Sequence, residues 1–274
     1  MSPPWRLAVF VLASAVGVLG LRLVHASLSA WIPVWGREAS FVIVMAGGML
    51  IGHLWTFRMV DARGWRFVGL GRDAWRTEPV LLGATLGALS IAIPAGALLA
   101  LGWLRAEPSN PGSSLGAAVA SLAVLIPASL WEELTVRGYA FATLRERWGA
   151  VRTILVTSLV FGGLHFLNAG ASIGAVSIVT MAGVFLGLVL VRTRSLYAAW
   201  AAHLSWNVVL VVVLHATVSG LAMQAPDYRI VDAGPDWATG GAWGPEGGLF
   251  AAAGLALATW IIFRRPSRRA ETDE

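Results

Sequence analysis

The sequence predicts an all-α, polytopic membrane protein with about eight transmembrane helices. Of its 274 residues, 57% are apolar and only 13% are charged, whereas globular chains carry about a quarter charged residues. The mean hydropathy is +0.71, so the chain has too little polar surface for a water-soluble domain. The apolar residues form long runs without strict alternation, which favours membrane helices over a membrane β-barrel.

Eight apolar stretches lie near or above the roughly 18 residues that indicate a membrane helix. In chain order they are Leu7–Val24, Ser40–Phe57, Val80–Leu104, Leu115–Tyr139, Val151–Leu167, Ile173–Val191, Leu196–Leu214 and Gly248–Phe263. No internal repeat is evident, and we expect residues 1–274 to form a single transmembrane domain. Two GxxxG patterns, Gly83–Gly87 and Gly183–Gly187, predict close packing of helices within the chain.

The distribution of arginine predicts the orientation. All 20 basic side chains are Arg, and basic loops stay on the cytoplasmic side of a membrane. With a cytoplasmic N-terminus, fifteen of the arginines fall on the inner side and three, Arg37, Arg105 and Arg229, on the outer side. Both termini are therefore predicted to be cytoplasmic. Residues 215–247 become a long outer loop, and its aromatic residues are expected at the membrane interface. These are Tyr228, Trp237 and Trp243.

Composition also excludes several classes of function. The chain contains no cysteine, which excludes disulfides, thiolate catalysis and Cys-ligated metals. The net charge of +5 does not indicate nucleic-acid binding, because the arginines lie in short gaps between apolar stretches and not on a basic soluble face.

The first stretch, with Arg6 before it, also fits a secretory signal, but nothing beyond this pattern indicates cleavage.

The fourth apolar stretch contains three charged residues, Glu132, Glu133 and Arg137. A charge at mid-bilayer costs about 2.5–3.5 kcal/mol on insertion scales and is retained mainly where it has a partner, a wet cavity or a substrate. Residues four apart share a helix face, so Glu133 is expected to pair with Arg137. Glu132 points elsewhere, and ion pairing leaves it unexplained.

Two further stretches carry His165, and His203 with Asn207 one helical turn later. Taken singly, each histidine is best interpreted as a satisfied core residue, as we also interpret the isolated His25 and His53. Taken together, polar groups on three helices must find partners in a dry environment, and the least costly solution is to meet one another.

Such a cluster is suited to activating water. A carboxylate can take a proton from water, and His203 and Asn207 can donate hydrogen bonds to a developing oxyanion. Peptide hydrolysis fits this set. Cysteine is absent and no G-x-S-x-G elbow occurs, so no covalent nucleophile is implied.

These residues resemble the three signature motifs of the CPBP family of intramembrane proteases, which includes CAAX prenyl endopeptidases of the Rce1 type and bacteriocin-processing or immunity-associated proteins. The resemblance covers residues 115–214. It implies a membrane endopeptidase in which Glu132 and His165 activate water, His203 and Asn207 support the oxyanion, and the substrate is a membrane-associated peptide cleaved near its carboxyl end. The motifs are Glu132-Glu133-x-x-x-Arg137, Phe161-x-x-x-His165 and His203-x-x-x-Asn207, with Glu133, Arg137 and Phe161 in supporting positions.

Three alternatives remain open from the sequence. Glu132, His165 and His203 would suit zinc, but no H-E-x-x-H pair is present and a metal-free mechanism is favoured. Midplane acids and histidines also form proton relays in carriers, although repeated halves are not visible. The third alternative is a non-catalytic scaffold or immunity protein. The Arg-only, Ala-rich and Gly-rich composition predicts a bacterial cytoplasmic membrane.

Overall fold

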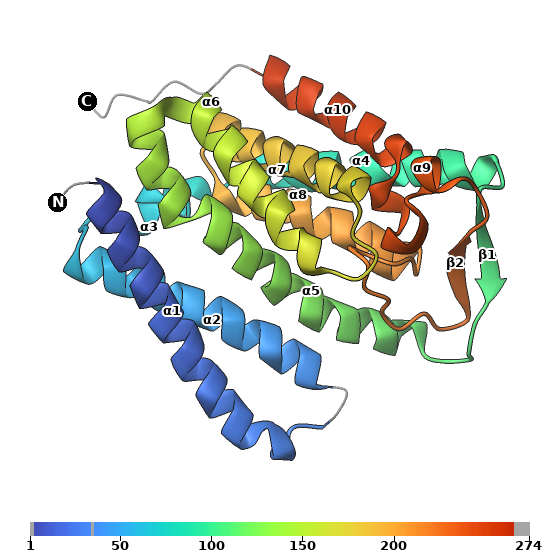
Figure 1. The fold of residues 1–274 in the computed structure, drawn as a ribbon, viewed down its shortest axis with the longest axis horizontal. Helices are drawn as coiled ribbons and strands as arrows, with labels where there is room; N and C mark the ends of the chain where they lie inside the picture. Colours follow the sequence, from blue (N-terminus) through green and yellow to red (C-terminus); the bar gives the residue numbers. More distant parts are fainter. Residues whose placement is uncertain (1–2, 34–35, 266–274) are drawn as a thin grey trace.

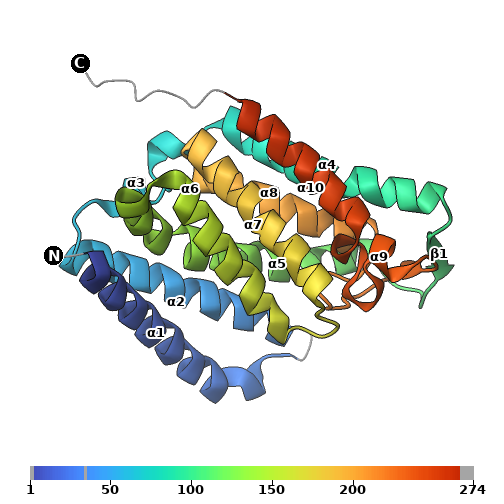
Figure 2. The ribbon, with the colours of Figure 1, turned by 45° about the horizontal axis from the view of Figure 1, so that its top comes forward.

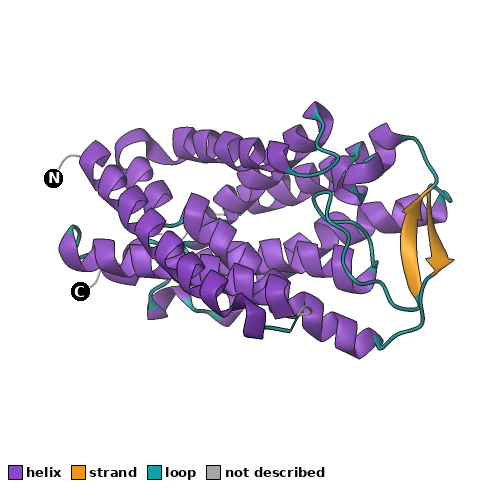
Figure 3. Ribbon diagram, turned by 60° about the horizontal axis from the view of Figure 1, so that its bottom comes forward, coloured by secondary structure: helices purple, strands orange, loops and turns teal. Residues whose placement is uncertain are grey.

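The computed structural model describes residues 3–33 and 36–265 and is mostly helical (Figure 1). Arg268 and Arg269, which belong to the predicted inner arginines, lie outside these residues. The long helices run side by side, and a two-stranded sheet lies at one end of the bundle (Figure 3). The α-helices are α1 (Pro3–Leu28), α2 (Arg37–Met59), α3 (Gly64–Phe67), α4 (Thr77–Ala100), α5 (Ser114–Arg137), α6 (Tyr139–Leu164), α7 (Ile173–Thr193), α8 (Leu196–Val208), α9 (Asp236–Thr239) and α10 (Leu249–Arg264). The strands are β1 (Leu104–Pro108) and β2 (Tyr228–Asp232), and the short turns that matter below are η4 (His165–Leu167), η5 (Val209–Val213) and η7 (Pro245–Gly247).

Six of the described helical segments are long and apolar enough to cross a membrane, so the protein is a polytopic integral membrane protein. The predicted fourth and fifth spans fall in one 54-residue segment, Ser114–Leu167. The predicted eighth span corresponds to α10, which has only 16 residues. The count of eight and the orientation of the termini stay predictions.

Helices α5 to α8 occupy the middle of the bundle, between the α1–α2 hairpin on one side and α4 with α10 on the other (Figure 2). The largest hydrophobic cluster draws side chains from every long helix. Its members include Phe10, Met49, Leu86, Leu125, Ile154, Phe185, Ala202 and Leu255.

The two GxxxG patterns pack helices within the chain, as predicted. A Cβ atom on Gly83 or Gly87 of α4 would overlap the backbone of Ala198 or Ala202 on α8. Gly183 of α7 likewise lies against Ser158 of α6. The contacts of Gly83 and Gly87 thus hold α4 against the part of α8 that carries His203.

Gly138 separates α5 from α6 and corrects the predicted fourth span, which ran on to Tyr139. The residue has φ −75° and ψ −133°, outside the helical region. His53 of α2 accounts for the break: its Nδ1 donates to the Met49 carbonyl at 2.8 Å, and its Nε2 accepts from the Tyr139 N–H at 3.1 Å. The imidazole thus caps the first turn of α6 and occupies the space where a side chain at position 138 would lie.

We expect Gly138→Ala to destabilise the fold by about 1–3 kcal/mol, the usual cost of overpacking a tight site. The new Cβ would overlap His53 Nε2 and the Leu134 carbonyl oxygen. Chemical unfolding of the purified protein in detergent measures the difference. Gly96→Ala in α4 is the matched control, since no atom lies within 4 Å of its new methyl group. Equal stability of the two variants would contradict the assignment.

Candidate active site

A buried ion pair lies at the centre of the site. Arg137 Nη1 donates to Glu133 Oε1 at 2.9 Å, and both side chains are fully buried. The i, i+4 pair expected from the sequence is confirmed. Arg137 Nη2 also donates to the Gly183 carbonyl oxygen at 3.3 Å, and its Cζ lies 4.2 Å from the centre of the Phe161 ring. The guanidinium therefore ties α5 to α6 and α7.

Glu132 points away from this pair, toward two imidazoles on other helices. Its Oε2 lies 3.7 Å from His203 Nε2 and 4.0 Å from His165 Nε2. Both distances exceed the length of a direct hydrogen bond, but a single water molecule can bridge polar atoms at such separations. The side chain of Glu132 is 30% exposed, in contrast to its buried neighbour.

Each imidazole is oriented through its Nδ1 atom. His165 stands at the carboxyl end of α6, where its Nδ1 donates to the Phe161 carbonyl oxygen at 2.8 Å. His203 Nδ1 donates to Glu133 Oε1 at 3.0 Å. Since both acceptors lack a proton, Nδ1 must carry the hydrogen in each ring. The Nε2 atoms of both rings are then turned toward Glu132.

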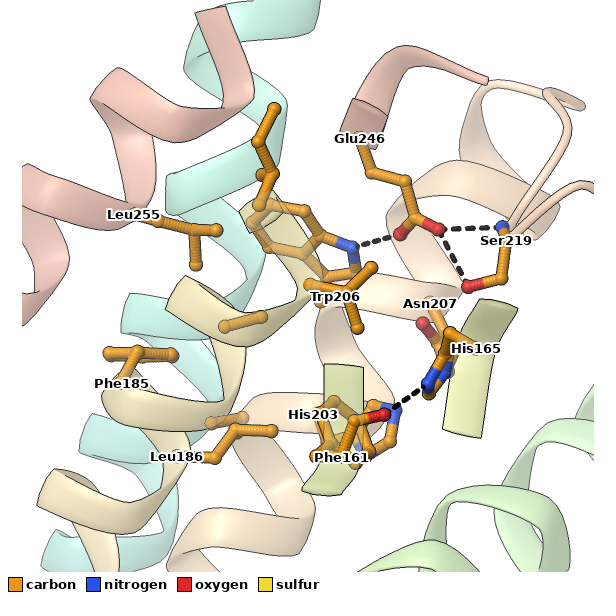
Figure 4. A pocket seen from close by; sticks show the side chains of 14 residues that line it. Phe161, His165, Phe185, Leu186, His203, Trp206, Asn207, Ser219, Glu246 and Leu255 are labelled. Atoms are coloured by element: carbon orange, nitrogen blue, oxygen red, sulfur yellow. Dashed lines mark hydrogen bonds between the residues drawn. The ribbon is translucent and has the colours of Figure 1, made fainter. Parts of the chain in front are cut away.

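His165, His203 and Asn207 line one cavity, shown in Figure 4. Asn207 follows His203 by one turn of α8, and the π-helical turn η5 begins two residues later. The cavity has a volume of about 40 Å³, and a polar cavity needs about 10–15 Å³ to hold a water molecule. The opposite wall is apolar and consists of Ile178, Val179, Phe185, Leu186 and Leu255.

The structure thus brings together the four residues singled out in the sequence. Glu132 reaches the two imidazoles from α5, and the other three side chains face the cavity. Two imidazoles and a carboxylate are a donor set that zinc accepts. Among residues 3–33 and 36–265, no group of three or more His, Asp or Glu side chains is placed to hold a metal ion.

Glu246 is a site residue that the sequence did not reveal. It lies in η7, is 6% exposed and lines the cavity. Its Oε2 accepts from Trp206 Nε1 at 2.7 Å, and its Oε1 accepts from the N–H and Oγ of Ser219 at 2.6 and 2.8 Å. Asn168, just after η4, donates to the Ser219 carbonyl oxygen at 3.1 Å. One carboxylate therefore connects the loop at Ser219 to α8 beside the cavity (Figure 4).

Trp243 corrects a prediction for residues 215–247. We expected it at the membrane interface, but it is only 1% exposed and its ring lies 6.5 Å from that of His165. Strand β2 pairs with β1 in an antiparallel register from Leu104↔Asp232 to Pro108↔Tyr228. The chain then returns to the bundle, where Glu246 accepts a hydrogen bond from Trp206 of α8 and the Gly220 N–H donates to the Trp243 carbonyl oxygen at 3.0 Å. A Gly- and Pro-rich stretch gives no periodic signal for such a return.

We expect Glu246→Gln to loosen the connection between Ser219 and α8. The amide keeps the shape of the side chain but loses charge-assisted hydrogen bonds, which contribute about 1.5–3 kcal/mol each. Hydrogen exchange at Ser219 and its neighbours should therefore accelerate, with the helices of the bundle unchanged.

Glu107→Gln at the same end of the molecule is the control, because the Glu107 side chain is 53% exposed and its ion pair with Arg229 is long, at 3.8 Å. Unchanged exchange at Ser219 in Glu246→Gln would show that the carboxylate does not hold this loop.

Comparison with known proteins adds one finding. Residues 114–209 match the family model described as type II CAAX prenyl endopeptidase, Rce1-like. No curated protein and no solved structure matches the chain. The matched segment runs from the start of α5 to the end of α8 and contains Glu132, His165, His203 and Asn207. Within this polytopic membrane protein, residues 114–209 are thus similar to the Rce1-like type II CAAX prenyl endopeptidases.

Proposed function

We propose that the protein is an intramembrane endopeptidase that hydrolyses a peptide bond of a membrane-associated substrate. The similarity of residues 114–209 to Rce1-like endopeptidases implies a protease of the CAAX type. The observation that carries the proposal is the convergence of Glu132 Oε2 and the Nε2 atoms of His165 and His203 from three helices. Polar groups in hydrocarbon are retained mainly where they have a function.

In the proposed reaction, a water molecule lies between Glu132 and His165. Glu132 takes the proton of this water, which His165 helps to position, as the oxygen attacks the carbonyl carbon of the substrate. The tetrahedral intermediate then collapses, the C–N bond breaks, and the proton passes to the leaving amine. The apolar wall of the cavity lowers the local dielectric constant, which strengthens the electrostatic interactions inside.

His203 and Asn207 are placed to stabilise the oxyanion. They lie one turn apart on the same face of α8 and line the same cavity. Preorganised donors of this kind commonly make the largest contribution to acyl transfer. The Nδ1 atom of His203 already donates to Glu133. For Nε2 to donate to the oxyanion as well, both ring nitrogens must carry a hydrogen, which is the imidazolium form. Glu133, Arg137 and Phe161 keep that ring in position.

Comparative analysis of carboxyl termini in cells tests the function and identifies the substrate. Cells that produce the protein should contain new carboxyl termini in a membrane protein or peptide. The same termini should be missing from cells that produce equal amounts of Glu132→Gln. If both cells have identical termini, the protein is not a protease in those cells, and the carrier and scaffold interpretations gain support.

We infer that the reaction needs no metal, because the proposed steps use only the groups of Glu132, His165, His203 and Asn207. Cleavage by the purified protein should therefore persist after treatment with a zinc chelator, measured with the substrate found in cells. Chelator titration paired with elemental analysis checks this. Stoichiometric zinc, together with activity lost to the chelator and restored by zinc, would overturn the inference and make Glu132, His165 and His203 the candidate ligands.

We also propose that residues 1–274 act as one transmembrane domain, with residues 115–214 as its catalytic core. The hydrophobic cluster that joins α1 to α10 supports this. The arginine distribution supports cytoplasmic termini, and the composition supports a bacterial cytoplasmic membrane.

A further inference from the structure

A second cavity lies at the end of the bundle where the arginine-rich loops gather. Its volume is about 380 Å³. The segment that contains α3, the first turns of α6 and the end of α7 form its walls. Its polar lining consists of Arg66, Arg137, Arg145, Arg194 and Glu146. We call it the basic cavity.

Glu146, the acidic residue in this lining, already has cationic partners. Glu146 forms ion pairs with Arg6 at 3.3 Å and with Arg63. Asp61 pairs with the same two arginines and also accepts a hydrogen bond from Tyr139 Oη at 2.9 Å. These contacts join α1, the loop that follows α2, and α6 into one network. Glu146 is therefore occupied by cations outside the cavity.

Two of the cavity arginines lack such compensation. Arg137 pairs with Glu133, and Arg66 lies 3.3 Å from Asp73. In the part of the chain that the structure describes, neither Arg145 nor Arg194 forms an ion pair, although both line the same cavity and carry like charges. Like charges held together are unfavourable, and a bound anion would relieve the repulsion.

The position of the basic cavity fits the level of lipid headgroups. Arg194 directly follows α7, and Arg145 lies four residues before Gly149, where α6 turns with φ +72°. Trp148 and Trp75 near these ends are 39% and 61% exposed, as is typical of tryptophan at a membrane interface. Basic pockets between transmembrane helices on the cytoplasmic side bind anionic headgroups.

We propose that the basic cavity binds the phosphate of an anionic phospholipid. The guanidinium groups of Arg145 and Arg194 supply planar pairs of donors that suit phosphate oxygens. The apolar side chains of Phe67, Val68 and Leu190 in the same lining accommodate the glycerol and the start of the acyl chains. This site is distinct from the cavity of His165 and His203, so it does not depend on the proposed proteolysis.

Lipid binding to the full chain in detergent tests the proposal, with dioleoyl phosphatidylglycerol as the probe and native mass spectrometry as the readout. We expect saturable binding that weakens at least about tenfold in Arg145→Gln/Arg194→Gln, since each charge-assisted contact contributes more than a neutral one. The control is Arg147→Gln/Arg152→Gln, which removes the same charge from residues that do not line the cavity. It should bind the lipid as the unmodified chain does.

Several results would overturn the proposal. These are equal binding by both double variants, equal loss in both, and binding of phosphatidylcholine as tight as that of phosphatidylglycerol. Displacement of the lipid by an equal concentration of inorganic phosphate would show a free-anion site instead. If Arg145→Gln/Arg194→Gln does not fold, photocrosslinking of the unmodified chain with a phosphatidylglycerol that carries a diazirine near its phosphate decides the matter: adducts around Phe67 and Leu190 support the site, and adducts only elsewhere reject it.

Discussion

Glu132→Gln is expected to lower the rate of peptide cleavage by about 10²–10⁴-fold, the range that a positioned general base contributes. The amide fills the same space but cannot take a proton from water. The substitution should change stability little, because Glu132 Oε2 has no hydrogen-bond partner among the described residues and the side chain is partly exposed. The cleavage rate is measured with purified protein and the substrate identified in cells, alongside the unfolding midpoint in detergent.

Glu38→Gln provides the matched control for this measurement. Glu38 is an exposed acid in the first turn of α2, so its replacement should leave both cleavage and stability unchanged. Cleavage by Glu132→Gln at the rate of the control would reject Glu132 as the base. A large loss of stability would instead show that the carboxylate has a structural function, as a silent scaffold would require.

Local features of this site could be predicted because helical periodicity is a short-range property. Residues four apart share a face, and this predicted both the Glu133–Arg137 pair and the common face of His203 and Asn207. The meeting of three helices followed from the cost of polar groups in hydrocarbon, and the distances between Glu132 and the two imidazoles agree with it.

Long-range features could not be predicted from a single sequence. Glu246 follows His203 by 43 residues, in a Gly- and Pro-rich segment that returns to the bundle through tertiary contacts such as that of Glu246 with Trp206. The end of α5 was also placed too late, because the contact between Gly138 and His53 joins residues far apart in the chain. In both cases the determining interaction is tertiary, and apolar periodicity carries no information about it.

The buried ion pair should show the opposite behaviour to Glu132, with a large effect on stability. Arg137→Met removes the guanidinium and leaves Glu133 charged and buried, and breaking a buried pair in this way costs about 3–5 kcal/mol. His203 Nδ1 remains as a donor to Glu133, but the contacts of Arg137 with Gly183 and Phe161 are lost. Denaturant unfolding in detergent measures the change.

A second substitution separates lost charge compensation from lost packing. Glu133→Gln added to Arg137→Met removes the uncompensated carboxylate, and we expect it to restore part of the stability, because replacing both partners of a buried pair is much less costly than removing one. Arg229→Met is the control for loss of an arginine: its side chain is 59% exposed, and exposed pairs contribute at most about 1 kcal/mol. If the double variant is no more stable than Arg137→Met, packing of the guanidinium against Phe161, and not its charge, is what stabilises the site. In that case the contribution of Glu133 would be to orient His203, and its charge would not be needed to stabilise Arg137.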